Sequence, residues 1–423
     1  MDKKLAILGG PKTILPEKAK FDWPRITPEV EAAVIKQLHE SVSIYNRSGI
    51  FEEFENRFSY YYGRKNGLLF NSGTSAIYAM YEGLGLGPGD EVICPTYTFF
   101  ASVSPLMSTG ARPVFCDCRM DGNIDPSEIA KNITPRTKAV VVTHMWGVPC
   151  EMDVIQEICS RNNLALLEDC SHAHGASFRG SKVGTFGTAA AWSLQGQKII
   201  TGGEGGILLT DSDDIYCRAL LLGHYNKRCE QEISKKHPLS EFSQTGFGQK
   251  LRAHPLAIAM ANQQFSHLDE WVVKKSQYAE WFIEELKNCR FLSMPQHNSG
   301  QPSWYALVML FNKAFANGVG IDKFVAALHA EGLVEVDLPH STCPIHNLPL
   351  FCSPSKAIPR LYKNKVYDTR SFANAEQFYQ KAIKIPVWAF SEDEVVVRAY
   401  IQGFKKVVEA VERQPELLCS PLK

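Results

Sequence analysis

The fold is most clearly indicated by the sequence LALLEDCSHAHG, residues 164–175. Its first half is a short continuous apolar run, which is typical of a strand buried on both faces of a sheet. Glu168, Asp169 and His172 follow at the carboxyl end of this run. Ligands of open α/β sheets bind beyond the carboxyl ends of the strands. We therefore expect these polar side chains to face a ligand crevice.

Other apolar runs surround this strand in the sequence. They are residues 67–70, 91–94, 113–116, 139–143, 189–192 and 207–210. Several stretches between them, such as 75–84 and 154–161, have apolar residues at helical spacing. This alternation predicts an α/β fold with a mostly parallel, seven-stranded sheet flanked by helices on both faces.

The second half of the chain has a different pattern. Residues 224–250 are polar and predict a mobile loop, and 256–268 predict a helix that ends the large domain. A smaller α/β domain follows, with helices at 278–286, 323–328 and 394–411 and a strand at 304–311. We therefore expect a large ligand-binding domain at 1–270, including the N-terminal segment, and a small domain at 271–423.

Composition excludes several classes of protein. The chain has 423 residues, of which 45% are hydrophobic and 21% charged, and its formal net charge is zero. No global field therefore favours nucleic acid or an anionic membrane. Residues 1–8 predict no signal peptide, and no apolar run approaches the roughly 18 residues of a membrane span. We expect neither nucleic acid nor a membrane as partner.

The cysteines indicate a reducing compartment. There are 12 of them, scattered along the chain, and none forms a C-x-x-C pair. Because metal-ligand spacing is absent, we expect buried thiols and no metal site. The predicted location is the cytoplasm.

Two further stretches carry residues suited to a phosphorylated ligand. Residues 71–75, Asn-Ser-Gly-Thr-Ser, follow a strand and open a helix, where backbone N–H groups bind phosphate well. Ser193 could donate to the same phosphate, and Lys198 could form a Schiff base if its pKa is lowered. The glycine-rich run 202–206 lets the backbone pass close to a bulky group. Taken singly, these features are better explained by an ordinary helix cap and a surface lysine.

The order of these motifs supports a stronger interpretation. With 73–74, 95–101, 168–175 and 193–206 in sequence, the chain resembles the DegT/DnrJ/EryC1/StrS family of aminotransferases that use pyridoxal 5′-phosphate (PLP). The resemblance extends over nearly the whole chain and implies the fold-type I aminotransferase architecture. It also implies a role in amino sugar, aminocyclitol or antibiotic biosynthesis.

The resemblance implies a role for each motif residue. Lys198 would carry the cofactor as an internal aldimine, and Asp169 would pair with the pyridine nitrogen. Phe99 would stack on the cofactor ring, and His172 would lie near its hydroxyl. The phosphate would be held by Gly73, Thr74 and Ser193.

Family members are homodimers with shared active sites, in which the partner usually sends an Asn to the phosphate. Lys250 stands at that position, two residues before Arg252. A lysine could pair with phosphate as a point charge, or it could be a surface residue. The loops at 43–49 and 224–226 match segments near the active site and could bind hydroxyls of the acceptor.

The implied reaction moves an amino group from L-glutamate or L-glutamine to a keto sugar or cyclitol ketone, with ping-pong kinetics. The segment before the lysine departs from the usual Ser-Phe-His/Tyr-Pro pattern and contains Gln195, Gly196 and Gln197. It resembles the branch that acts on cyclitol ketones such as scyllo-inosose, which puts a nucleotide-linked acceptor in doubt.

Other activities remain open. One alternative is a PLP enzyme that acts on a non-sugar ketone. Another is a sugar dehydratase, although in those relatives a His replaces the lysine and here Lys198 is present. A non-catalytic regulatory protein with this fold is a distant third alternative, because no basic face or recognition-helix module is visible.

Overall fold

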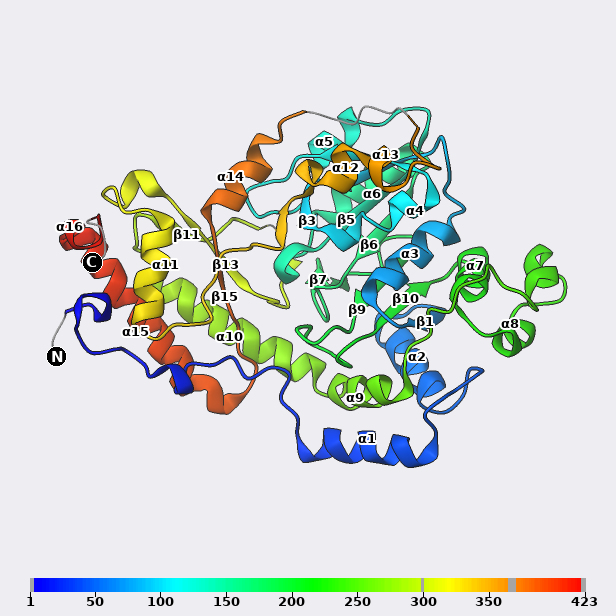
Figure 1. The fold of residues 1–423 in the computed structure, drawn as a ribbon, viewed down its shortest axis with the longest axis horizontal. Helices are drawn as coiled ribbons and strands as arrows, with labels where there is room; N and C mark the ends of the chain where they lie inside the picture. Colours follow the sequence, from blue (N-terminus) through cyan, green and yellow to red (C-terminus); the bar gives the residue numbers. More distant parts are fainter. Residues whose placement is uncertain (1–3, 298–299, 364–369, 420–423) are drawn as a thin grey trace.

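A computed structural model describes residues 4–297, 300–363 and 370–419, and the predicted strands form one seven-stranded sheet (Figure 1). In sheet order these are β1 (Asn66–Phe70), β10 (Gly206–Thr210), β9 (Ala189–Ser193), β6 (Ala165–Asp169), β5 (Thr137–Thr143), β2 (Glu91–Pro95) and β4 (Arg112–Cys116). Strand β10 runs antiparallel to both of its neighbours, and the other neighbouring pairs are parallel. The predicted α/β fold with a mostly parallel sheet is therefore confirmed.

Helices cover both faces of this sheet. On β5, Val141 belongs to the core on one face, whereas Val140 and Val142 belong to the core on the other, as the two-residue period of a strand requires. The first face is covered by α3 (Gly73–Gly83), α4 (Leu106–Thr109) and α7 (Asp213–Gly223). The second is covered by α2 (Gly49–Tyr62), α5 (Pro126–Lys131), α6 (Met152–Arg161) and α9 (Pro255–Phe265).

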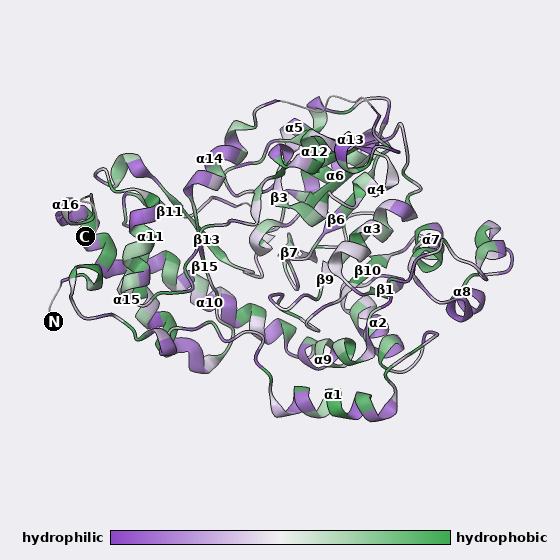
Figure 2. Cartoon of the chain, in the orientation of Figure 1, coloured by the Kyte–Doolittle hydropathy of each residue, from purple (hydrophilic) through white to green (hydrophobic). Residues whose placement is uncertain are grey.

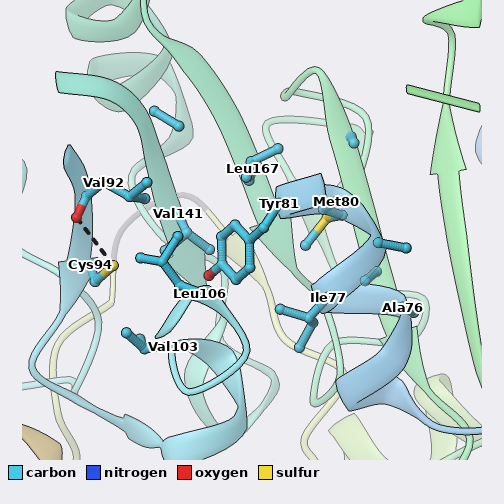
Figure 3. Close-up of a cluster of buried hydrophobic side chains, with 14 of the residues drawn as sticks. Ala76, Ile77, Met80, Tyr81, Val92, Cys94, Val103, Leu106, Val141 and Leu167 are labelled. Atoms are coloured by element: carbon cyan, nitrogen blue, oxygen red, sulfur yellow. Dashed lines mark hydrogen bonds between the residues drawn. The ribbon is translucent and has the colours of Figure 1, made fainter. Parts of the chain in front are cut away.

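Helix α3 is fixed against the sheet by a dense apolar cluster (Figure 3). Ile77 and Tyr81 on α3 lie in the same fully buried core as Val141 and Leu167 on the strands. Burial of side chains of this size contributes about 1.5–3 kcal/mol each. The cluster therefore holds the first turn of α3 in place at the carboxyl end of the sheet.

A second, smaller core lies on the left in Figure 1. Its three-stranded antiparallel sheet contains β11 (Leu292–Ser293), β13 (Leu307–Phe311) and β15 (Ala382–Ile385). Helices α10 (Leu268–Leu286), α11 (Ile321–Ala330), α15 (Glu394–Arg413) and α16 (Glu416–Cys419) surround it. Leu5 and Ala19 pack into this core, so the N-terminal segment lies along the small lobe.

The chain crosses between the two lobes more than once. After α11, the chain returns to the large lobe, where β14 (Thr342–Pro344) pairs with β3 (Tyr97–Phe99). Helices α12 (Pro349–Cys352) and α13 (Pro354–Ala357) follow, and α14 (Ala373–Lys381) leads back to β15. A small sheet of β7 (Ser177–Phe178), β8 (Ser181–Lys182) and β12 (Gly300–Gln301) adds another contact. The division into domains 1–270 and 271–423 stays a prediction.

Helix α1 (Pro28–Glu40) lies beside α9 at the edge of the large lobe and carries both apolar and polar residues along its length (Figure 2). Ile35 and Leu38 on this helix are about half exposed, at 47% and 51%. In the described part of the chain, no helix is both long and apolar enough to cross a bilayer.

Two local predictions need correction. The polar stretch 224–250 is not a loop throughout, because it contains α8 (Asn226–Glu232). Arg228 on α8 is buried and donates two hydrogen bonds, of 2.9 and 2.8 Å, to the carboxylate of Glu55. The strand predicted at 304–311 begins only at Leu307, because Trp304 has a left-handed backbone with φ of 54°.

Candidate active site

The carboxyl ends of the parallel strands border a cavity of about 500 Å³ between the two lobes. Its walls include seven of the eight predicted site residues: Gly73, Thr74, Phe99, Asp169, His172, Ser193 and Lys198. The eighth, Lys250, does not line the cavity of its own chain. The predicted residues therefore come together as a group, and their individual roles stay predictions.

Lys198 provides a buried amine in the loop between β9 and β10. The residue is 9% exposed, and its ammonium nitrogen lies 4.6 Å from the centre of the Tyr305 ring. Burial lowers the pKa of Lys198 to about 8, although the nearby charge of Asp169 acts in the opposite direction. About a tenth of Lys198 is therefore an uncharged, nucleophilic amine at pH 7, compared with well under a hundredth for a lysine of ordinary pKa.

Asp169 ends β6 and presents an ordered carboxylate to the cavity. One of its oxygens accepts a 2.6 Å hydrogen bond from the Ser102 hydroxyl, and the other accepts a 3.0 Å bond from the backbone N–H of Ser171. Ser102 is in turn hydrogen-bonded to Thr98 at 2.9 Å. These two hydrogen bonds fix the orientation of the carboxylate at the end of β6, where it could pair with a cationic ring nitrogen.

The neighbouring acid, Glu168, is held by backbone hydrogen bonds within the fold. Its carboxylate accepts hydrogen bonds from the backbone N–H groups of Gly184, Phe186 and Gly187. It also contacts His144 at 3.2 Å, and these groups are fully buried with Cys170. Because backbone donors already occupy both carboxylate oxygens, this cluster resembles a folding contact more than a metal site.

An anion-binding corner forms where α3 begins. A Cβ atom on Gly73 would lie 2.5 Å from the Cβ of Ser193, so only glycine lets the helix approach β9 this closely. Ser72 caps the helix by accepting a 3.1 Å hydrogen bond from the N–H of Ser75. The N–H groups of Gly73 and Thr74 in the first helical turn have no partner within the helix. Together with the Ser193 hydroxyl, they suit a phosphate group.

His172 and Tyr305 form a flat aromatic wall of the cavity. Their rings are 4.0 Å apart and almost parallel, and Trp146 stacks behind His172 at 5.7 Å. Burial, together with the charge of Lys198, lowers the pKa of His172 well below its usual value, and its Nδ1 has no hydrogen-bond partner. The imidazole is therefore neutral and has a free polar atom for a ligand hydroxyl.

Sequence reasoning missed Tyr305, because this residue comes from the small lobe. The backbone N–H of Ser303 donates to the carbonyl of Gly147 at 3.0 Å, which ties the turn to the large lobe. Trp304 and Trp146 both adopt left-handed backbone conformations there, at φ of 54° and 58°. Bulky residues rarely occupy this region, and such strain gathers at functional sites. An aromatic pair, Trp304-Tyr305, directly before an apolar strand is the only local signal.

Sequence reasoning also missed the small-lobe wall, which contains Asp337 and Lys384. The two residues pair through both backbone N–H groups, at 2.9 and 2.7 Å. Their side chains form an ion pair of 3.8 Å. A lysine within the otherwise apolar strand β15 was a usable signal, because isolated charges in buried strands are uncommon.

The two loops predicted near the acceptor lie together, outside the cavity of their own chain. Tyr45 and Tyr225 are in ring contact at 5.4 Å. Lys250 and Arg252 each place a cationic group 5.2 Å from the Tyr225 ring. Lys250, the residue predicted to reach the phosphate of a partner subunit, lies on this basic and aromatic surface.

The cavity fits PLP on its own chemistry. It offers a buried amine for an aldehyde, an ordered carboxylate for a ring nitrogen and a helix N-terminus for a phosphate, all among the residues that line one cavity. The family model for the DegT/DnrJ/EryC1/StrS aminotransferase family matches residues 26–401. The chain belongs to this family. The predicted aminotransferase activity and PLP cofactor are thereby confirmed at the level of the family.

Individual relatives agree with this assignment. A Micromonospora echinospora protein described as "Putative L-glutamine:3-amino-2,3-dideoxy-scyllo-inosose aminotransferase" is 33% identical over 83% of each chain. The dTDP-3-amino-3,4,6-trideoxy-alpha-D-glucose transaminase of Streptomyces venezuelae is 27% identical over 93% of this chain and 96% of its own. The crystal structure of S. venezuelae DesV in complex with a ketimine intermediate has a TM-score of 0.75 and 28% identity, covering 91% of this chain and 95% of its own.

Proposed function

We propose that this protein transfers the amino group of L-glutamine or L-glutamate to a neutral polyhydroxylated ketone, a cyclitol ketone or a keto sugar, by ping-pong kinetics. The observation that carries this proposal is the buried amine of Lys198 in one cavity with the carboxylate of Asp169. The relative named for glutamine and an inosose supports this choice of donor and acceptor.

Each site residue has a defined task in this reaction. Lys198 is the cofactor's attachment point, and its freed amine moves the proton of the donor Cα as a general base. Asp169 keeps the ring nitrogen protonated, and Gly73, Thr74 and Ser193 hold the phosphate. Bound PLP supplies an electron sink for the charge left at Cα. Neutral His172 would hydrogen-bond the ring hydroxyl, and the Phe99 ring would pack against the cofactor.

The remaining lining favours a neutral polyol as acceptor. Gln195, Gln197, Glu204 and Ser341 offer amide, carboxylate and hydroxyl groups to the cavity. Gln197 is already oriented, because its Oε1 accepts a 3.3 Å hydrogen bond from the Tyr305 hydroxyl. No arginine stands among the described lining residues. A pyrophosphate usually requires arginine or several lysines, so a nucleotide-linked sugar fits this wall less well.

An acceptor panel tests the proposal. Enzyme first converted to its amino form by glutamine is mixed with scyllo-inosose, a dTDP-linked keto sugar, or pyruvate, and the amine product is followed. The proposal predicts the highest kcat/KM with the free polyol ketone. Preference for the nucleotide-linked sugar would support the activity of the S. venezuelae transaminase instead, and preference for pyruvate would support the non-sugar alternative.

We further propose a cytoplasmic homodimer in which Lys250 reaches the partner's phosphate site. Support comes from the position of Lys250 on an exposed basic and aromatic surface and from the exposed apolar side chains of α1. Replacing Lys250 by Ala should weaken PLP binding, whereas replacing exposed Lys236 should not. A monomer in sedimentation experiments with full activity would contradict this proposal. A role in antibiotic biosynthesis stays a prediction.

A further inference from the structure

Lys384 is a second lysine that lines the cavity. It lies on β15 of the small lobe, and its side chain is 33% exposed. Its positive charge reaches His172, whose ring is stacked on Tyr305. Tyr305 in turn contacts Lys198. Lys384 and Lys198 therefore line the same cavity, Lys384 from the small lobe and Lys198 from the large one.

The partner of Lys384 holds it only loosely. Asp337 is 3.8 Å away, which is longer than a direct hydrogen bond. Asp337 has other partners, since it accepts a 2.8 Å hydrogen bond from the N–H of Leu338 and lies 3.3 Å from His340. If Lys384 turned to an incoming anion, the Asp337 carboxylate would keep these contacts. The exchange therefore leaves no carboxylate without a partner.

We propose that Lys384 binds the α-carboxylate of the amino-acid donor. This inference rests on the proposed function, in which a glutamine or glutamate amine reacts at the Lys198 end of the cavity. Of the described residues that line the cavity, the only lysines are Lys198 and Lys384, and Lys198 is committed to the cofactor. Glutamine has a single carboxylate, next to the reacting carbon. Lys384 is the cation placed to receive it.

The weak Lys384–Asp337 ion pair also explains how one cavity could bind two chemically different substrates. A ping-pong enzyme binds an anionic donor and then, on the proposed function, a neutral polyol in the same space. With the donor bound, Lys384 faces a carboxylate. With the polyol bound, Lys384 returns to Asp337, so the neutral ligand meets no unpaired cation, and Asp337 offers an acceptor to its hydroxyls. The bound donor would therefore contact the small lobe through Lys384 and the large lobe at the Lys198 end of the cavity.

The test compares Lys384→Met with Lys384→Arg in the donor half-reaction. The methionine variant should raise the donor concentration needed for half-maximal rate roughly 10- to 100-fold, because a charge-assisted hydrogen bond is lost. Arginine should restore most of the affinity. The acceptor half-reaction should keep its KM. Lys313→Met, on an exposed turn of the small lobe, is the matched control.

A ligand change gives an independent readout. Dissociation constants are measured by calorimetry for 2-methyl-L-glutamine, which lacks the Cα proton, and for its α-carboxamide. The wild type should bind the carboxylate much more tightly than the amide, and Lys384→Met should bind both equally. A preference that survives in Lys384→Met, or a rise in acceptor KM alone, overturns the inference. Lys384→Gln replaces the methionine variant if that one does not fold. If wild type shows no donor half-reaction at all, the proposed function itself fails.

Discussion

The indole N–H of Trp23 donates a 2.9 Å hydrogen bond to the main-chain carbonyl of Lys198, 175 residues later in the chain. The Trp23 ring is fixed edge to face against Trp271 at 5.3 Å and lies 5.7 Å from the Phe390 ring. The backbone of Lys198 is therefore held by the N-terminal segment, which itself packs against α10 and the segment that follows β15. We infer that Trp23 is a positioning residue for Lys198.

Replacing Trp23 by Phe keeps an aromatic ring but removes the N–H donor. We expect the free energy of unfolding to fall by about 0.5–1.5 kcal/mol, because one hydrogen bond is lost. Capture of PLP by the apoenzyme should also slow, because Lys198 is less well oriented. Denaturant titration and rapid-mixing absorbance measure the two effects. Trp281→Phe, away from the cavity, is the control, and equal behaviour of the two variants would remove the positioning role.

The capture of PLP should depend on pH through Lys198. Burial lowers the pKa of this lysine to about 8, so it is an ammonium below that pH and a nucleophilic amine above it. The rate of covalent attachment should therefore rise with pH and reach half its plateau near pH 8. An ordinary lysine would give a midpoint near about 10.4. A midpoint at that higher value in rapid-mixing experiments would show that Lys198 is not desolvated.

Asp169 and Glu168 are adjacent acids with different expected effects. Asp169→Asn should lower kcat about 100-fold or more, because the ring nitrogen loses its charged partner. The fold should persist, since an amide can still accept from Ser102. Glu168→Gln should instead lower the melting temperature, because its carboxylate accepts from the backbone N–H of Gly184 and of Gly187. Equal losses of kcat per folded molecule would contradict the separation of roles.

The buried pair of Arg228 and Glu55 predicts a large effect on stability. Arg228→Met should cost about 3–5 kcal/mol of unfolding free energy, because the buried Glu55 carboxylate loses two hydrogen bonds from a cation and retains the longer 3.4 Å contact with Arg47. Removing both charges in Arg228→Met/Glu55→Leu should recover part of that loss. Arg413→Met serves as the control, since its side chain is 71% exposed and its ion pair is with Glu409 on the same helix. A small change in Arg228→Met, measured by denaturant titration, would contradict the burial of this pair.

The large sheet is predictable from sequence because each of its strands is a short, continuous apolar run between polar turns. Strand β5 is buried on both faces, so its sequence is a continuous apolar run and not an alternation of apolar and polar residues. The catalytic end is predictable because Asp169 follows such a run directly. Lys198 can be predicted as a site residue only from the motifs around it, since an isolated lysine is usually a surface residue.

The small-lobe contribution is much harder to predict. Tyr305 and Lys384 line the cavity because of tertiary contacts between segments that are distant in the sequence. No local sequence pattern predicts that these two residues lie in one cavity. The turn at Trp304 is equally hidden, because a left-handed tryptophan is not a sequence signal. Helix α8 was obscured for a related reason: Arg228 looks like a surface charge until Glu55 is placed beside it.

The most direct test of the account is the visible absorption spectrum of the purified enzyme with PLP, before and after L-glutamine or L-glutamate is added without acceptor. The account predicts a band from covalently attached cofactor that bleaches with one of these donors and returns with a polyol ketone. Lys198→Ala should show no such band and no turnover. A band in wild type that neither donor bleaches, or turnover by Lys198→Ala, would contradict the central claim that Lys198 performs amino-group transfer.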